Sequence, residues 1–271
     1  MKSLRILTGT LLALCLAAPA PALSKGIVIS GSTTVLPIMQ KTVEAYLELH
    51  PGLEISLSAS GSGDGIKAII DGTANLAMSS REMKDSELAK AKEKGVQLQP
   101  VAIATDAILP IVNPANSAAN ISKAQLKGIY TGEITNWKDL GGEDTPIVVV
   151  SRDSSSGTYE AWGELVLDKA RVTARALLQP SSGAVLQFVS KNRQAIGYES
   201  FGYVNDKVKA LLVDNIVGNP ETIDNGTFPI TRKLWIITTD NPDAEVAAFL
   251  EFLNSQEVKD IIAACGAVPI K

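Results

Sequence analysis

The stretch Gly26-Ile27-Val28-Ile29-Ser30-Gly31-Ser32-Thr33-Thr34-Val35-Leu36-Pro37 joins a β-rich run to a loop of glycine and hydroxyl residues. Apolar residues then recur at helical spacing until Pro51-Gly52 ends the pattern. The stretch predicts a strand, a loop and a helix in that order, at residues 26–30, 31–34 and 34–50. N–H groups at the start of a helix are unpaired and lie at the positive end of the helix dipole, so the loop is a candidate anion site. Simple capping of the helix by a hydroxyl is the alternative.

A second loop of the same kind, Ser60-Gly61-Ser62-Gly63-Asp64-Gly65, follows a predicted strand at 53–58. The glycines let the backbone approach a ligand closely. Their spacing is not GxGxxG, and Asp64 would repel a pyrophosphate, which argues against a dinucleotide site. Further elements continue the alternation of strand and helix: helix 64–71, strand 76–78, helix 85–94 and an apolar strand 101–112. This alternation predicts a parallel βαβ layer.

The third loop, Arg152 followed by Ser154-Ser155-Ser156-Gly157-Thr158, is the most specific. It follows a predicted strand at 146–150 and opens a predicted helix at 158–168. A guanidinium offers planar, charge-assisted donors to an oxyanion. The hydrolase motif Gly-x-Ser-x-Gly is excluded because position 154 is serine, and the single histidine, His50, ends the first helix far from this loop.

The rest of the chain predicts helices at 123–130, 185–190, 244–253 and 257–265, and strands at 195–198, 211–213 and 229–238. We expect an α/β fold: a two-lobed clamshell, each lobe a mainly parallel sheet flanked by helices. The strands at 101–112 and 229–238 are the predicted hinge. The expected division is 23–107 and 229–271 for lobe 1, and 108–228 for lobe 2. Ligands bind beyond the carboxyl ends of parallel strands, so facing lobes would bring the three loops into one cleft that closes by hinge motion.

The first 22 residues read as a cleaved secretory signal. Lys2 and Arg5 precede an apolar run, and Ala20-Pro21-Ala22 fits a cleavage site. Lipid attachment at Cys15 is less favoured because Leu14 is a poor fit for the small residue usual before a lipidated cysteine. Cleavage would leave Cys265 as the single cysteine and change the formal net charge from −4 to −6. An acidic exported protein argues against nucleic acid and anionic membranes as partners.

One histidine and no cysteine cluster give no support for a metal, and we expect no cofactor. Ser79-Ser80-Arg81 follows the strand at 76–78 and could add a fourth loop to the cleft. Arg81 either enters that cleft or pairs with Glu82 or Asp85 at the surface.

With these loops the chain closely resembles the periplasmic phosphate-binding proteins of ABC transporters, the PstS-like family, from about Gly26 to the C-terminus. The most diagnostic stretch is Ile129-Tyr130-Thr131-Gly132-Glu133-Ile134-Thr135-Asn136-Trp137-Lys138-Asp139-Leu140. The three loops match as well, together with Ile196-Gly197-Tyr198 and Pro229-Ile230-Thr231. The resemblance implies a type II solute-binding fold and a monomer that is not an enzyme. It also implies capture of inorganic phosphate between the lobes and delivery to membrane permease subunits.

By position, the resemblance carries the phosphate ligands onto Ser32, Thr33, Thr34, Ser62, Ser80, Arg152, Ser156, Gly157 and Thr158. Well-known members have an aspartate at the place of Ser80, which accepts the proton of hydrogen phosphate. A serine hydroxyl both donates and accepts, so it discriminates less between phosphate and sulfate. Asp64 or Asp106 could supply the acceptor instead. Another oxyanion (sulfate, molybdate or tungstate) is the second hypothesis, and a secreted phosphohydrolase is the third.

Overall fold

The structure is a computed structural model that describes residues 26–270. The predicted signal peptide at 1–22 and Cys15 lie outside the described residues. No helix among the described residues has both the length and the apolar character needed to cross a bilayer.

Lobe 1 is built on three parallel strands in the order β2-β1-β3. They are β1 (Ile27–Gly31), β2 (Ile55–Ala59) and β3 (Leu76–Ser79). The helices α1 (Leu36–Leu49), α2 (Ser62–Ile70) and α3 (Asp85–Glu93) follow them in turn. The predicted βαβ alternation is confirmed. The second helix begins at Ser62 rather than at Asp64, because the positive φ of 147° at Gly61 turns the chain just before it.

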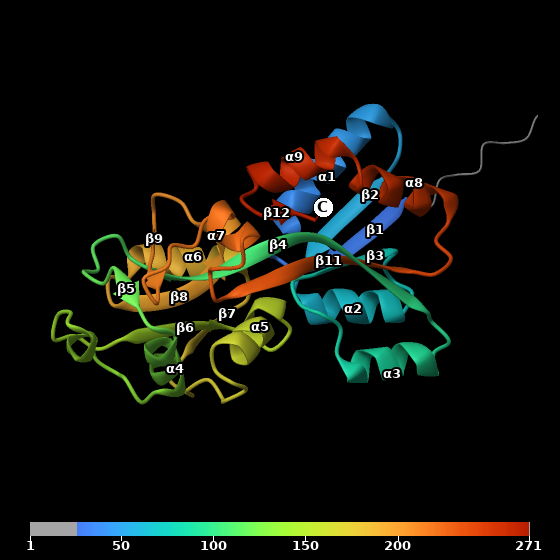
Figure 1. Ribbon diagram of the computed structural model, residues 1–271. Coiled ribbons are helices and arrows are strands. Elements are labelled where there is room, and N and C mark those ends of the chain that lie inside the picture. Colours follow the sequence, from blue (N-terminus) through green and yellow to red (C-terminus); the bar gives the residue numbers. More distant parts are fainter. Residues whose placement is uncertain (1–25, 271) are drawn as a thin grey trace, which may run out of the picture.

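Two long strands connect the lobes, as Figure 1 shows: β4 (Leu98–Val112) and β11 (Thr231–Thr239). The first part of β4 pairs antiparallel with β11, and its last part, from Ile108 to Val112, pairs antiparallel with β8 (Ala195–Ser200) of lobe 2. A single strand therefore pairs with strands of both lobes.

Lobe 2 repeats the arrangement with three parallel strands in the order β7-β6-β8. β6 (Val148–Arg152) is flanked by β7 (Leu177–Gln179) and β8. The helices of this lobe are α4 (Lys123–Thr131), α5 (Gly157–Leu165), α6 (Ser182–Lys191) and α7 (Pro220–Asp224). Smaller elements are β5 (Asn120–Ile121), β9 (Lys209–Ala210), β10 (Leu212–Val213) and the 3₁₀ turns η1 (Trp137–Leu140) and η2 (Phe201–Tyr203).

The chain ends in lobe 1, where α8 (Ala244–Leu253) and α9 (Gln256–Ala264) pack near α1 (Figure 1). A final short strand, β12 (Val268–Pro269), pairs with β4. Lobe 1 therefore contains both the first and the last described segments, which makes the two crossings at β4 and β11 necessary.

Each lobe has its own hydrophobic core. In lobe 1, Tyr46 of α1 packs edge-on against Phe249 of α8, with ring centroids 5.0 Å apart. In lobe 2, Trp162 of α5 stacks on Tyr198 of β8 at 4.5 Å. Because the cores are separate, each lobe can hold its shape while the angle between the lobes changes. The fold is the expected two-lobed α/β clamshell.

Candidate functional site

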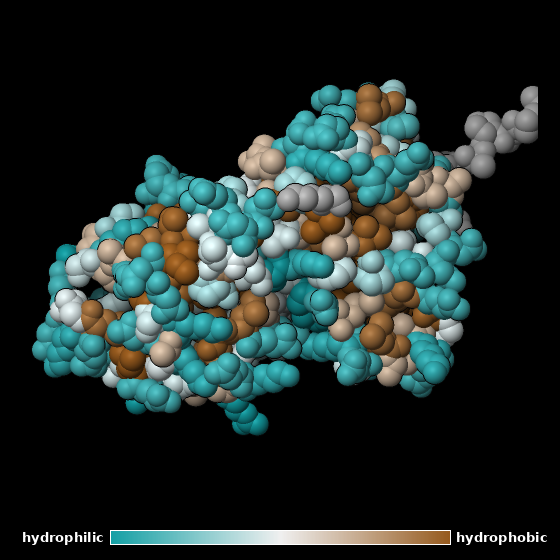
Figure 2. Space-filling view, in the orientation of Figure 1, coloured by the Kyte–Doolittle hydropathy of each residue, from teal (hydrophilic) through white to brown (hydrophobic). Residues whose placement is uncertain are grey.

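All nine predicted site residues lie together and are buried at the junction of the lobes. Lobe 1 contributes Ser32, Thr33, Thr34, Ser62 and Ser80, and lobe 2 contributes Arg152, Ser156, Gly157 and Thr158. They follow the carboxyl ends of β1, β2, β3 and β6. Figure 2 shows hydrophilic residues at the narrow junction between the two bulges of the molecule. The structure thus brings the three loops together, as expected.

The loops of the two lobes touch directly. The hydroxyls of Thr34 and Thr158 are 2.9 Å apart, and the Gly63 N–H donates to the carbonyl of Ser155 at 3.0 Å. A Cβ on Gly157 would lie 2.3 Å from Ser62 Oγ and 2.7 Å from Ser80 Oγ. Only glycine permits this approach, which brings the first turn of α5 onto the serine hydroxyls of lobe 1.

Four helices begin at this junction: α1, α2, α5 and α6. At α5 the Ser156 hydroxyl caps the first turn by accepting from the Tyr159 N–H at 3.2 Å. The earlier N–H groups of that turn have no partner within the helix, as at every helix start. Helix N-termini from both lobes therefore direct partial positive charge to the same place, where an anion is favoured.

Arg152 is buried and held by three neutral groups. Its Nε donates to the Gln179 carbonyl at 3.0 Å, its Nη2 to the Pro180 carbonyl at 3.2 Å and its Nη1 to the Ser182 hydroxyl at 3.3 Å. These partners fix the guanidinium without neutralising its charge, which leaves Arg152 suited to an anion. Strand β7, which supplies Gln179, was not predicted because its leucines are exposed and show no alternation.

Ser182 is a site residue that the sequence analysis missed. Its hydroxyl lies 3.2 Å from that of Thr33 in lobe 1, and its N–H donates to the same Thr33 oxygen at 3.3 Å. It begins α6, directly after the N-cap Ser181. A serine pair before a predicted helix is the signal that could have indicated it, but the helix was expected to begin three residues later.

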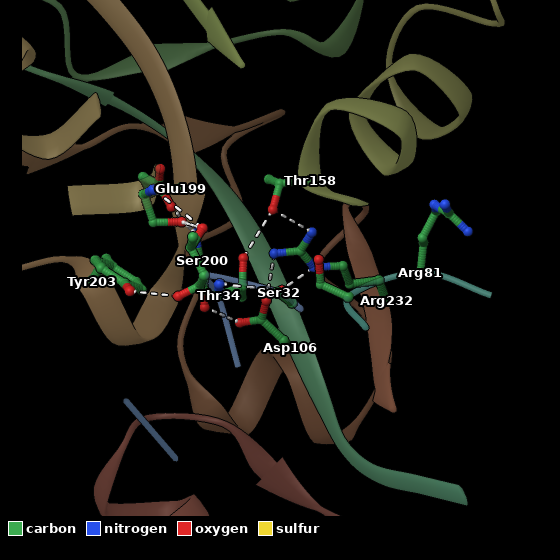
Figure 3. Close-up of polar contacts among 12 residues, drawn as sticks. Ser32, Thr34, Arg81, Asp106, Thr158, Glu199, Ser200, Tyr203 and Arg232 are labelled. Atoms are coloured by element: carbon green, nitrogen blue, oxygen red, sulfur yellow. Dashed lines mark hydrogen bonds and ion pairs between the residues drawn. The ribbon is translucent and has the colours of Figure 1, made fainter. Parts of the chain in front are cut away.

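Arg232 and Asp106 were also missed as a pair. They lie opposite each other where β11 and β4 pair, and Nε and Nη2 of Arg232 contact Asp106 Oδ2 at 3.1 and 3.0 Å. The Nη1 group of Arg232 donates to the Thr158 hydroxyl at 2.9 Å, and the Ser200 hydroxyl donates to Asp106 Oδ1 at 2.7 Å (Figure 3). Burial raises the pKa of Asp106, although Arg232 opposes the rise. This network joins the hinge strands to a predicted ligand of lobe 2.

Neither proposed alternative acceptor is free within the cluster. Asp64 is exposed in the first turn of α2. Asp106 is fully buried but is used by Arg232 and Ser200. A different carboxyl, Glu199 of β8, is fully buried beside the cluster, and burial raises its pKa to about 7.

Arg81 contradicts both readings of the sequence. It is buried outside the hydroxyl cluster, and its Nη atoms donate to both carboxylate oxygens of Glu87 on α3 at 2.8 and 2.7 Å. Its Nε lies 2.9 Å from Glu160 of α5, in the other lobe, and Lys84 contacts the second oxygen of Glu160 at 2.6 Å. Glu82 supplies only its backbone carbonyl, and Asp85 forms no ion pair with Arg81 among the described residues. The physical reason is that α3 and α5 close over Arg81 from two sides.

A cavity of about 630 Å³ lies elsewhere on lobe 2, beside Trp137, Gln187 and Arg193, and none of the nine predicted residues lines it. Among residues 26–270, no three His, Cys, Asp or Glu side chains are grouped to hold a metal ion. The donors at the junction are N–H groups, hydroxyls and guanidinium groups, and two buried carboxyls, Asp106 and Glu199, lie beside them.

Comparison with known proteins shows the family of the chain. The family model described as a PBP superfamily domain matches residues 17–257. The chain is 32% identical to the phosphate-binding protein PstS of Bacillus subtilis over 91% of this chain and 81% of that one. It is 31% identical to PstS of Borreliella burgdorferi over 90% of this chain and 89% of that one.

Solved structures are similar as well. One is described as a candidate phosphate ABC transporter substrate-binding protein from Clostridium perfringens with bound phosphate. It superposes with a TM-score of 0.85 at 36% identity, covering 91% of this chain and all of that one. An ABC-type phosphate transport receptor from Vibrio cholerae gives a TM-score of 0.73 at 34% identity, covering 89% of this chain and 99% of that one. The chain therefore belongs to the PBP superfamily and, within it, to the PstS family of phosphate-binding proteins.

Proposed function

We propose that this chain captures inorganic phosphate between its two lobes and delivers it to the membrane permease of an ABC transporter. The main support is the burial, at one junction, of donors from the ends of four strands and the starts of four helices. Its relatives are named as phosphate-binding proteins, which favours binding over the phosphohydrolase.

The proposed ligands are the nine residues named above. The hydroxyls of Ser32, Thr33, Thr34, Ser62, Ser80, Ser156 and Thr158 and the N–H groups at the helix starts, including that of Gly157, would replace the water around the anion. Arg152 would supply the full positive charge. A neutral hydrogen bond contributes about 0.5–1.5 kcal/mol and a charged one about 1.5–3 kcal/mol. Micromolar affinity needs about 8 kcal/mol, which such a set can supply despite desolvation.

The location and lobe boundaries belong to the same proposal. We infer export to the periplasm through cleavage of residues 1–22, release without a lipid at Cys15, and a monomer that binds no nucleic acid. We place lobe 1 at 23–107 and 229–271 and lobe 2 at 108–228. The two hydrophobic cores divide the described chain near the same positions, which supports these boundaries.

Calorimetry of the processed protein with phosphate, arsenate and sulfate tests the proposal. Arg152→Ala should weaken phosphate binding at least tenfold without unfolding the protein, because it removes the buried guanidinium of the cluster whose hydrogen-bond partners are all neutral. Arg193→Ala is the matched control, since Arg193 pairs with Glu143 on the surface of lobe 2 and should leave affinity unchanged. Unchanged affinity in Arg152→Ala would remove Arg152 from the site.

A second candidate function is the binding of another oxyanion. It is favoured by Ser80, whose place in the cluster holds a hydroxyl and not a carboxylate. Competition of sulfate, molybdate and tungstate against labelled phosphate separates the two candidates: the true ligand is the one that displaces the others at the lowest concentration.

A further inference from the structure

Two carboxyls are buried among the described residues, Asp106 and Glu199. They differ in what surrounds their oxygens. Asp106 accepts from Arg232 on one oxygen and from Ser200 on the other. Glu199 accepts the Ser200 N–H on Oε2 at 3.3 Å, while its Oε1 has no hydrogen-bond partner among the described residues. A buried oxygen without a donor is costly, so Oε1 is the open position of this junction.

Ser182 connects this open oxygen to the predicted anion site. Its hydroxyl contacts Arg152 Nη1 and the Thr33 hydroxyl, which are both predicted phosphate ligands. It also lies beside the Glu199 carboxyl and stabilises its ionised form. Glu199 is thus separated from the proposed ligands by a single hydroxyl group.

A serine hydroxyl has one proton and two lone pairs. If the Ser182 proton turns to the Glu199 carboxylate when an anion binds, both lone pairs of the hydroxyl face away from it, toward Thr33 and Arg152. When Thr33 and Arg152 turn their hydrogens to a bound anion, those lone pairs are free to accept. Hydrogen phosphate has an O–H that can donate to these lone pairs. Sulfate has none, so its oxygens would be repelled by the lone pairs and by the negative carboxylate behind them.

We propose that Glu199 holds the Ser182 proton away from the anion, and so makes Ser182 the hydrogen-bond acceptor that selects hydrogen phosphate over sulfate. The inference rests on the proposed function, because it concerns the same site. In it Ser182 is a contacting residue and Glu199 a positioning residue.

The charged groups around Glu199 determine how the pair of Glu199 and Ser182 responds to pH. Arg152 of β6 and Arg232 of β11 favour its ionised form, and burial opposes it. Tyr130 of α4, Tyr198 of β8 and Tyr203 of η2 also face it, and their pKa values are raised, so they stay neutral near pH 7. Asp106 is linked to Glu199 through Ser200. Sulfate keeps its charge between pH 5.5 and 8.5, so any change of its affinity with pH comes from the protein.

The test is calorimetry with phosphate and with sulfate on the full processed protein. Glu199→Gln should lower the preference for phosphate over sulfate by about tenfold or more, because its amide donates a hydrogen to Ser182 and frees the serine proton for the anion. Ser182→Ala should lower the preference similarly, and Glu199→Asp should restore part of it. Glu143→Gln, an exposed change in the same lobe, should keep the wild-type ratio.

Sulfate titrations of the wild type add a measurement that needs no variant. Sulfate should bind more tightly as pH falls from 8.5 to 5.5, and the slope should vanish in Glu199→Gln. A wild-type protein that binds phosphate while both variants keep its selectivity would overturn this inference and leave the proposed function standing. So would sulfate binding that is flat with pH in the wild type. A wild type that binds no phosphate would overturn both.

Discussion

Replacing Glu160 of α5 tests what holds the two lobes together in the closed form, the arrangement in which their loops touch. Glu160 belongs to lobe 2, yet its two oxygens contact Arg81 Nε at 2.9 Å and Lys84 Nζ at 2.6 Å, which both belong to lobe 1. None of the three is among the predicted phosphate ligands. Replacing Glu160 by glutamine removes the charge that joins the lobes while it preserves the shape of the side chain. The closed form should lose stability, and each separate lobe should lose none.

The magnitude follows from the burial of the pair. A hydrogen bond to a buried charged group contributes about 1.5–3 kcal/mol, and an exposed ion pair about 0–1 kcal/mol. The contact of Arg81 Nε with Glu160 is an ion pair without hydrogen-bond geometry, but the two side chains are only 7% and 17% exposed, which puts this pair between the two cases. Arg81 keeps Glu87 as a partner in the variant, so no buried charge is left alone. We expect a loss of about 1–2 kcal/mol, or a Kd for phosphate about 5- to 30-fold weaker.

Calorimetry gives the Kd, and stopped-flow fluorescence gives the dissociation rate. Most of the change should appear as faster dissociation, because the contact forms only after the lobes meet. The matched control is Asp71→Asn, which breaks the contacts of Asp71 with Lys67 and Lys94 entirely within lobe 1. Wild-type affinity and dissociation in Glu160→Gln would refute the reasoning, as would an equal loss in Asp71→Asn.

Two further predictions concern the junction itself. Gly157→Ala should weaken phosphate binding at least tenfold, because its Cβ would lie 2.3 Å from Ser62 Oγ. Gly163→Ala on the same helix, where a Cβ meets nothing within 4 Å, should leave affinity unchanged in the same calorimetric assay. Glu199 should make the free energy of unfolding depend on pH. Its pKa in the folded protein, about 7, lies above the ordinary 4.5. The folded protein therefore has its full stability below about pH 4.5, where Glu199 is neutral, and loses stability as the pH rises through 7. Urea unfolding without phosphate should show wild-type stability falling, between pH 4.5 and 8, by roughly 3 kcal/mol more than that of Glu199→Gln; parallel pH profiles would contradict it.

The sequence predicts those parts of the fold that local pattern determines. Helix α8 is predicted at its observed bounds because its apolar residues recur at helical spacing. The donor loops at 31–34 and 60–65 are also local signals, since each lies between a strand and a helix. The short strand β7 has no such pattern, so the sequence does not predict that the carbonyl of its residue Gln179 accepts a hydrogen bond from Arg152.

The missed site residues share a different cause. Arg232 and Asp106 are 126 positions apart and meet only because β11 and β4 pair in this register. Glu199 follows directly after the predicted strand at 195–198, and a lone acidic residue there gives no sign of burial. Residues that tertiary pairing brings to the site carry no local pattern, so the sequence identifies the donor loops and not the carboxyls behind them.

The charges at the junction divide into two roles, which explains how an acidic protein can hold an anion. Arg232 is neutralised by Asp106 and fixes Thr158 from the hinge side. Arg152 has only neutral partners in hydrogen-bond contact, and it is therefore the cation that we propose for the ligand. The contact of Arg81 with Glu160 joins the lobes outside this cluster, and we expect it to affect closure alone. Affinity can therefore be changed at Glu160 without changing which anion is preferred, and selectivity can be changed at Glu199 while the contact that closes the lobes stays intact.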